Sequence, residues 1–126
     1  MGLVCGCQLM TGALDPEAMR RSVENLSYGA VASYCAEVPG TRQGAPVDTL
    51  IFFADEEQAL FQMFAIAEEA SKRWDANVAL AQRLGELMPG DSSLVIVVAC
   101  TDRGDAFDCC RYVADQFAAR VPVRAD

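Results

Sequence analysis

The chain has 126 residues, about the length of one domain, and 52% of them are hydrophobic, so it is long enough to bury a core without disulfide or metal support. Ten basic and eighteen acidic side chains give a net charge of −8, which argues against a protein whose main role is to bind nucleic acid, and against a basic membrane-surface helix. The sequence contains no histidine, so Ser-His-Asp and Cys-His nucleophile systems and imidazole metal sites are excluded.

The N-terminus lacks the features of a targeting segment. It has no basic stretch followed by a long apolar run, and the longest aliphatic run, residues 94–100, is far too short to cross a bilayer. We therefore expect a cytoplasmic protein that does not associate with membranes. In that compartment the six cysteines are expected to be reduced. Their spacing lacks the C-x-x-C pairs of zinc sites, so we expect no bound metal.

Predicted strands and helices alternate along the chain. Strands are expected where apolar and β-branched residues run between turn signals, at residues 3–9, 29–38, 47–54, 77–84, 93–100 and 121–123. The largely apolar segment of residues 47–54 predicts a strand buried on both faces, whereas Pro122 places the last strand at a sheet edge. Main helices are expected at residues 15–26, 55–74 and 103–120. This order predicts a single α+β domain over residues 1–126, with the helices packed on a mixed or antiparallel sheet.

The predicted helices have recognisable starts and apolar faces. Asp15 and Asp55 are the expected N-caps of the first two. Glu68 and Lys72 are expected to pair on the outer side of the second helix. Apolar positions recur at helical spacing, and the side chains expected to face the core are Ala18, Val23, Leu26, Leu60, Met63, Phe64, Ala67, Ala70, Trp74, Ala106, Phe107, Cys110, Val113, Ala114 and Phe117.

Several blocks of the sequence resemble, in order, the motifs of the large, catalytic subunit of molybdopterin synthase. Residues 29–39 read GAVASYCAEVP, where that family has GAVVxFxGxVR. The stretch IAEEA and the following Trp74 resemble the family's long helix. Later blocks read QRLGELMPGD, DRGDAF and DQFAARVPVRA, where the family has HRxGELxxGE, HRxxAF and DxxKxxxPxWK. The register holds without gaps from about Gly29 to the end.

The resemblance implies a function. In that family a small ubiquitin-like sulfur carrier inserts its C-terminal Gly-Gly thiocarboxylate into a pocket of the large subunit. Sulfur then passes to a cyclic pterin phosphate precursor, which gives the dithiolene of the molybdenum cofactor. The family forms a homodimer of large subunits with one carrier at each end, and we expect no resident cofactor. The pocket must hold a carboxylate-like tail and a phosphate, which requires cations.

The sequence departs from the family where charge is handled. The two family lysines fall on Ala118 and Ala125, the loop arginine falls on Pro39, and the motif histidines fall on Gln82 and Asp102. Methyl groups cannot stabilise an anionic intermediate, so we expect the ordinary mechanism to be impaired. We hypothesise a binding or partner module for the carrier. The alternatives are an active sulfur-transfer enzyme with rearranged residues, and a purely structural dimer without a ligand.

Some cations and thiols remain as candidate site residues. Arginine pairs with a carboxylate or phosphate through two hydrogen bonds but serves neither as a proton donor nor as a nucleophile, so these cations predict binding rather than turnover. A solvated surface position is the alternative for most of them, and no catalytic residue is assigned. The candidates for anion or substrate binding are Arg103, Arg120, Arg124, Arg42 and Tyr34, and those for carrying sulfur as a persulfide are Cys35 and Cys100.

Overall fold

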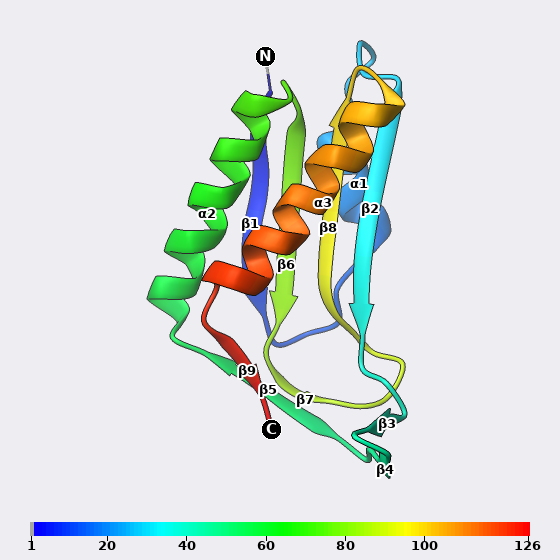
Figure 1. The fold of residues 1–126 in the computed structure, drawn as a ribbon, viewed down its shortest axis with the longest axis vertical. Helices are drawn as coiled ribbons and strands as arrows, with labels where there is room; N and C mark the ends of the chain where they lie inside the picture. Colours follow the sequence, from blue (N-terminus) through cyan, green and yellow to red (C-terminus); the bar gives the residue numbers. More distant parts are fainter. Residues whose placement is uncertain (1) are drawn as a thin grey trace.

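A computed structural model describes residues 2–126, and its main sheet has four strands in the order β1-β6-β8-β2 (Figure 1). These strands are β1 (Val4–Met10), β2 (Ala30–Glu37), β6 (Asn77–Arg83) and β8 (Ser92–Cys100). The β1 strand runs parallel to β6, whereas β6 and β2 both run antiparallel to β8. The sheet is therefore mixed, and β1 and β2 form its two edges.

Helices cover both faces of this sheet. Figure 1 shows α2 (Glu56–Arg73) and α3 (Arg103–Arg120) side by side on one face, with the short α1 (Pro16–Val23) behind the sheet. Side chains alternate between the faces along each strand, so two cores form. The larger core lies beneath α2 and α3 and includes Met63, Ile66, Leu80, Ile96 and Val113. The smaller core, beneath α1, consists of Val23, Ala79, Val95, Val97 and Ala99. This architecture confirms the predicted α+β class.

A second, three-stranded sheet closes one end of the molecule. Its order is β7-β5-β9, with β5 (Leu50–Ala54) antiparallel to both β7 (Gly85–Leu87) and β9 (Val123–Ala125). A hairpin of β3 (Thr41–Arg42) and β4 (Ala45–Pro46) lies beside it (Figure 1). The last strand occupies a sheet edge, as predicted. The prediction that residues 47–54 form a strand buried on both faces is wrong, because β5 packs its Leu50 inward and leaves Ile51 half exposed.

Helix boundaries agree with the sequence better for the long helices than for the short one. Both expected caps are present, with the Asp15 and Asp55 carboxylates accepting hydrogen bonds from the amides of Ala18 and Gln58. The first helix, however, ends at Val23 rather than at residue 26. None of the helices in the described part of the chain is long and apolar enough to cross a membrane.

Five side chains that were expected in the core are exposed instead: Ala18, Leu26, Leu60, Phe64 and Phe107. Leu26 lies beyond the end of α1. Each long helix packs against the sheet along one stripe, which in α2 contains Ala59, Met63 and Ile66. Leu60 and Phe64 follow a different stripe of α2, so their helical spacing does not bring them to the core.

Candidate functional site

Two of the predicted anion-binding residues lie at the small-sheet end of the molecule, Arg124 in β9 and Arg42 in the adjoining β3-β4 hairpin. Arg124 in β9 pairs with Phe53 in β5, and its guanidinium carbon lies 4.9 Å from the centre of the Phe53 ring. Arg42 Nη2 donates a hydrogen bond to the carbonyl of Ala125, the next residue along, at 3.3 Å. Both arginines are exposed. A guanidinium stacked on a ring keeps donors on its edge for a carboxylate or phosphate.

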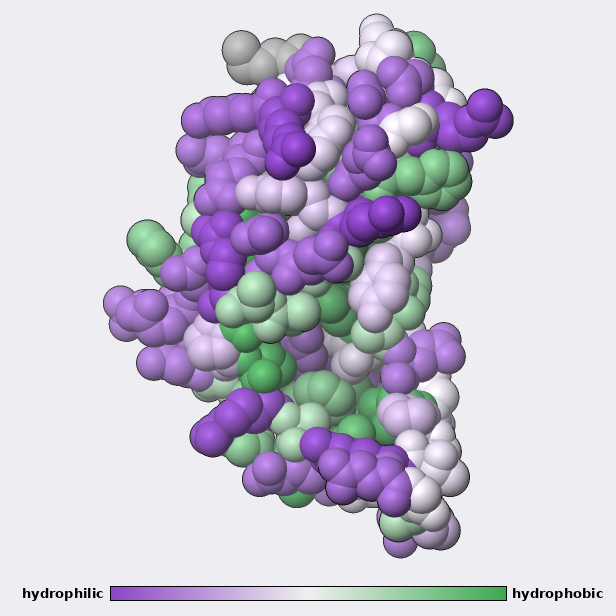
Figure 2. Space-filling model, in the orientation of Figure 1, coloured by the Kyte–Doolittle hydropathy of each residue, from purple (hydrophilic) through white to green (hydrophobic). Residues whose placement is uncertain are grey.

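Ala118 and Ala125, the two positions on which the sequence resemblance places the family lysines, fall at the same end of the molecule. Ala118 is exposed in the last turn of α3, and Ala125 lies in β9 against the small core of Val38, Leu50 and Leu87. Figure 2 shows hydrophobic side chains gathered over the lower end of α3 and the small sheet, around a hollow in the surface with hydrophilic groups at its rim. Ala118 and Ala125 contribute only methyl groups here, whereas Arg42 and Arg124 contribute exposed guanidiniums.

Arg120 does not join Arg42 and Arg124, because it is bound to side chains of α2. Its Nη1 and Nη2 atoms donate to Glu69 at 2.8 and 3.0 Å, and its Nε donates to Gln62 at 3.2 Å. The Tyr112 hydroxyl donates to the same carboxylate at 2.7 Å. These hydrogen bonds, Arg120 first, lower the pKa of Glu69 to about 2. Arg120 therefore links α3 to α2, and most of its donors are already engaged.

Arg103 lies away from Arg42 and Arg124 within one subunit. Arg103 opens α3, and that helix of 18 residues is about 27 Å long, so Arg103 is at the far end from β9. Asp102 is the N-cap of this helix and accepts a hydrogen bond from the Asp105 amide at 2.9 Å. Tyr34 is half exposed on β2.

The two candidate sulfur-carrying thiols are not brought together. Cys35 is exposed in β2 and pairs with Val95, whereas Cys100 is buried at the end of β8 and pairs with Ala30. Five residues of strand separate these pairs, which is about 17 Å. Burial, with smaller contributions from Asp105 and Asp102, raises the pKa of Cys100 to about 11. Burial and Glu37 also raise the pKa of Cys35, so both are thiols rather than nucleophilic thiolates at neutral pH.

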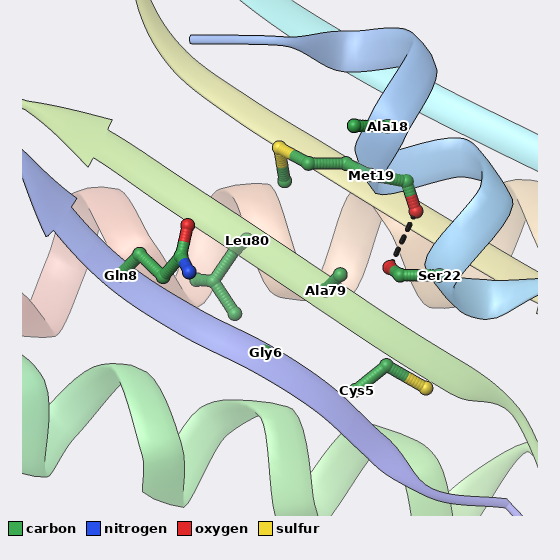
Figure 3. A pocket seen from close by; sticks show the side chains of 8 residues that line it. All are labelled: Cys5, Gly6, Gln8, Ala18, Met19, Ser22, Ala79 and Leu80. Carbon is green, nitrogen blue, oxygen red and sulfur yellow. Dashed lines mark hydrogen bonds between the residues drawn. The ribbon is translucent and has the colours of Figure 1, made fainter. Parts of the chain in front are cut away.

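A small pocket separates α1 from β1 and β6 (Figure 3). Figure 3 shows its lining of Cys5, Gly6, Gln8, Ala18, Met19, Ser22, Ala79 and Leu80, which includes no charged side chain. The space beside Gly6 is open, because a Cβ added at this position would meet nothing within 4 Å. Burial raises the pKa of the Cys5 thiol. The pocket therefore lacks the cations of an anion site. Within residues 2–126, no group of three carboxylates or thiols is arranged to hold a metal ion.

The β2 edge of the main sheet is bordered by grooves. One groove of about 450 Å³ runs between β2 and α3, and its lining includes Tyr34, Phe107 and Arg111. Another lies on the opposite face, between α1 and β2, and its lining includes Arg20 and Ser33. Val31 borders both grooves and is 43% exposed. β2 is thus open along its edge and on parts of both faces.

Sequence analysis missed the cluster that joins α2 to α3. The Arg73 guanidinium lies 4.3 Å from the centre of a Trp74 ring, and the rings of Trp74 and Tyr112 are 5.2 Å apart. Trp74 was expected in the core, but it is half-buried in this surface cluster. Glu69 was not singled out, because its role depends on the packing of α2 against α3. The sequence offered one local indication of a role for Glu69, its position one helical turn before Arg73.

Comparison with known proteins identifies the class. The family model for the MoaE protein matches residues 9–120. The chain is 33% identical over 102 residues to the molybdopterin synthase catalytic subunit of Pyrococcus abyssi. The matched stretch covers 80% of this chain and 69% of that protein. The solved structure of molybdopterin synthase from Staphylococcus aureus has the same fold, with a TM-score of 0.89 at 22% identity over 93% of this chain and 86% of that one.

A third comparison concerns an assembly. A chain in the complex of subunits 1 and 2 of the molybdopterin-converting factor from Helicobacter pylori has a TM-score of 0.80 at 19% identity, over 94% of this chain and 82% of that one. The mixed sheet with its small terminal sheet is therefore the fold of molybdopterin synthase catalytic subunits. The chain belongs to the MoaE family, which acts in molybdenum cofactor biosynthesis, and this confirms the resemblance found in the sequence.

Proposed function

We propose that this chain is a partner subunit that receives the C-terminal Gly-Gly tail of a ubiquitin-like sulfur carrier but is impaired in making molybdopterin from a pterin phosphate. The observation that carries this proposal is that Arg42 and Arg124 both lie at the small-sheet end of the molecule, where Arg42 donates a hydrogen bond to the carbonyl of Ala125 and Arg124 stacks on Phe53. Two guanidiniums bind a carboxylate or phosphate well, but they provide no proton donor near pH 7 and no nucleophile.

The other cations do not supply the missing chemistry. Lys72, the single lysine of the sequence, pairs with Glu68 at 3.1 Å on the outer side of α2. Arg120 is held by Glu69. The similarity to a complex of two converting-factor subunits supports a second protein as the partner. An active enzyme with rearranged residues is the competing possibility, and the same assay tests it.

The experiment has a binding arm and an activity arm. The host's own Gly-Gly-tailed carriers are titrated against the protein by calorimetry, with carriers lacking the last two glycines as controls. We expect tail-dependent binding that Arg42→Ala and Arg124→Ala weaken. In the activity arm the thiocarboxylated carrier and the pterin precursor are supplied. We expect conversion far below that of an ordinary synthase, with a gain when Ala118→Lys, Ala125→Lys and Pro39→Arg are combined. Full conversion of the precursor by the unmodified protein would overturn the proposal that its catalysis is impaired.

We also propose that two copies pair through their β2 edges. Support comes from the open edge itself, from the grooves beside it, and from the exposed Val31, Tyr34 and Phe107 along it. Across a twofold axis the two β2 strands would run antiparallel. That arrangement carries the start of α3 in one copy toward the small sheet of the other. Arg103 would then approach Arg42 and Arg124 across the dimer, although it is remote from them within one subunit.

Mass measured by light scattering during size-exclusion chromatography tests the pairing. We expect twice the monomer mass of 13.6 kDa at micromolar concentration. Val31→Lys should shift the mass toward the monomer, because it places a charge on the edge that pairs. Phe61→Lys on α2 is the matched control and should leave the mass unchanged. A wild-type protein that is monomeric at micromolar concentration contradicts the proposal.

A further inference from the structure

We infer that a cleft between α2 and α3 binds a nucleoside monophosphate, a small ligand that combines a flat nitrogen heterocycle with one anionic group. The cleft is a shallow cavity of about 260 Å³, and the residues that line it are Arg73, Trp74, Asp108, Arg111, Tyr112 and Asp115. We call it the α2-α3 cleft. The inference is independent of the proposed function, which places the tail of the carrier at the small-sheet end of the molecule.

The cleft contains two aromatic rings that the fold holds in place. The ring centres of Trp74 and Tyr112 are 5.2 Å apart, and the ring planes are inclined by 58°. The Tyr112 hydroxyl donates a hydrogen bond to Glu69 at 2.7 Å, and Arg120 holds the same carboxylate. Both aromatic residues are half-buried, so each keeps part of its surface exposed. Fixed rings of this kind can stack a flat ligand at little cost in conformational entropy.

Two arginines supply positive charge to the cleft. The Arg73 guanidinium carbon lies 4.3 Å from the centre of a Trp74 ring and 5.4 Å from the centre of the Tyr112 ring. A guanidinium stacked in this way keeps its edge donors for a carboxylate or a phosphate. Arg111 is exposed on α3. Within residues 2–126 neither arginine is ion-paired with a carboxylate, whereas Arg120 is. The cleft therefore offers two guanidiniums to an oxyanion.

Two carboxylates limit which anions fit the cleft. Asp108 and Asp115 lie three residues before and four residues after Arg111, so the three side chains share one face of α3. They balance the two arginines, so the lining has no net charge. A ligand with several negative charges, such as a triphosphate, would be repelled by these carboxylates, whereas a single oxyanion can be held by the guanidiniums. The carboxylates themselves accept hydrogen bonds, so they fit the amino and ring N–H groups of a heterocycle.

These groups favour a guanine ring over an adenine ring, and a small ligand over a protein. Guanine has a ring N–H beside its amino group, and one carboxylate can accept both hydrogen bonds. Adenine has an acceptor nitrogen beside its amino group, which does not match a carboxylate. The surface around the cleft is mainly hydrophilic, as Figure 2 shows over the upper half of α2 and α3. It therefore lacks the apolar centre of a protein-protein interface.

Trp74 is the single tryptophan of the sequence, so its indole N–H signal in a nitrogen-15 NMR spectrum reports directly on the cleft. The experiment titrates GMP into the full chain and follows this signal. We expect a saturable shift with a dissociation constant below about 1 mM. Arg73→Ala and Arg111→Ala should each weaken binding about tenfold, because each removes a charge-assisted hydrogen bond. Arg124→Ala at the small-sheet end is the matched control and should leave binding unchanged. Melting curves establish that all variants are folded.

A comparison of probes tests the roles assigned to the charges. We expect GMP to bind more tightly than AMP, GTP or inorganic phosphate, and the double variant Asp108→Asn/Asp115→Asn to lose the preference for GMP over AMP. Equal binding of GMP and AMP by the wild type overturns the choice of a guanine ring. The whole inference is overturned if millimolar GMP leaves the Trp74 signal in place. It is overturned equally if Arg124→Ala abolishes binding while Arg73→Ala does not, because the nucleotide then occupies the small-sheet end.

Discussion

Arg120 at the end of α3 and Glu69 on α2 form a bidentate ion pair, with N–O distances of 2.8 and 3.0 Å. The same carboxylate accepts the Tyr112 hydroxyl, so one side chain fixes two positions of α3 against α2. Since β9 follows α3 directly, this contact also fixes the strand that carries Arg124. An arginine that the sequence suggested for anion binding thus helps to position a different arginine, which is free to bind one.

Glu69→Gln should lower the free energy of unfolding at pH 7 by about 1 kcal/mol, because partly exposed ion pairs and their hydrogen bonds contribute on that scale. Urea unfolding followed by circular dichroism measures the change. Glu68→Gln is the matched control, since its pair with Lys72 is more exposed and should contribute less than about 0.5 kcal/mol. Equal losses from the two variants would show that the Glu69 network has no special role.

The same carboxylate should give the protein an acid-sensitive component of stability. The pKa of Glu69 is about 2 in the fold, against an ordinary value of 4.5. A lowered pKa stabilises the fold fully above the ordinary value, and this contribution is lost as the pH falls from about 4.5 toward 2. Unfolding curves for wild type and Glu69→Gln should therefore converge over that range. Curves that stay parallel down to pH 2 would contradict the assignment.

Replacement by alanine should destabilise the protein at Gly2 but have little effect at Gly6. At Gly2 a Cβ would collide with the backbone of Ser71 and Ala76, whereas at Gly6 it would enter the open pocket beneath α1. We expect Gly2→Ala to lower stability by about 1 to 3 kcal/mol, as steric conflicts with fixed backbone do, and Gly6→Ala to change it by less than about 0.5 kcal/mol. Thermal melts measure both. A tolerant Gly2 would mean that the chain start shifts freely away from α2.

Patterns local to each element predicted the long helices and the main sheet well. Asp55 and the Pro-free run behind it define α2 almost to the residue, and the apolar run ending at Cys100 forms the central strand β8. These signals depend on neighbours along the chain, such as capping side chains and β-branched residues, so the sequence displays them directly.

Properties that depend on distant partners were harder to predict. The run containing Leu50 and Ile51 reads as a fully buried strand, yet it pairs with β7 and β9 in a sheet with only one covered face. The site shows the same limit. Periodicity cannot reveal that Arg42 meets Ala125, 83 positions away, or that Glu69 engages Arg120. The identity of the remaining cations was predictable, but which of them lie together depends on the tertiary fold.

Tyr28→Phe should leave stability unchanged or raise it by up to about 1 kcal/mol. The Tyr28 hydroxyl oxygen is buried and has no hydrogen-bond partner, so removing it relieves a desolvation cost without breaking a bond. Tyr112→Phe is the matched control and should lower stability by about 1 kcal/mol, because it breaks the 2.7 Å hydrogen bond to Glu69. Urea denaturation compares them. A destabilised Tyr28→Phe protein would indicate an ordered water bound to the hydroxyl.

Thiol reactivity provides the last prediction, and it concerns the alternative of direct sulfur transfer. Cys35 is the exposed cysteine among those of the described chain, whereas Cys100, Cys109 and Cys110 are buried. A limiting amount of an aromatic disulfide reagent should therefore modify Cys35 first, as identified by mass spectrometry of peptides. Because the pKa of Cys35 is raised by burial and by Glu37, its rate should be slow at pH 7 and increase beyond pH 9, where an ordinary thiol levels off. Glu37→Gln should make the reaction faster at a given pH. Rapid, pH-independent labelling at neutral pH would instead reveal a thiolate, and would favour a sulfur-carrying role for Cys35.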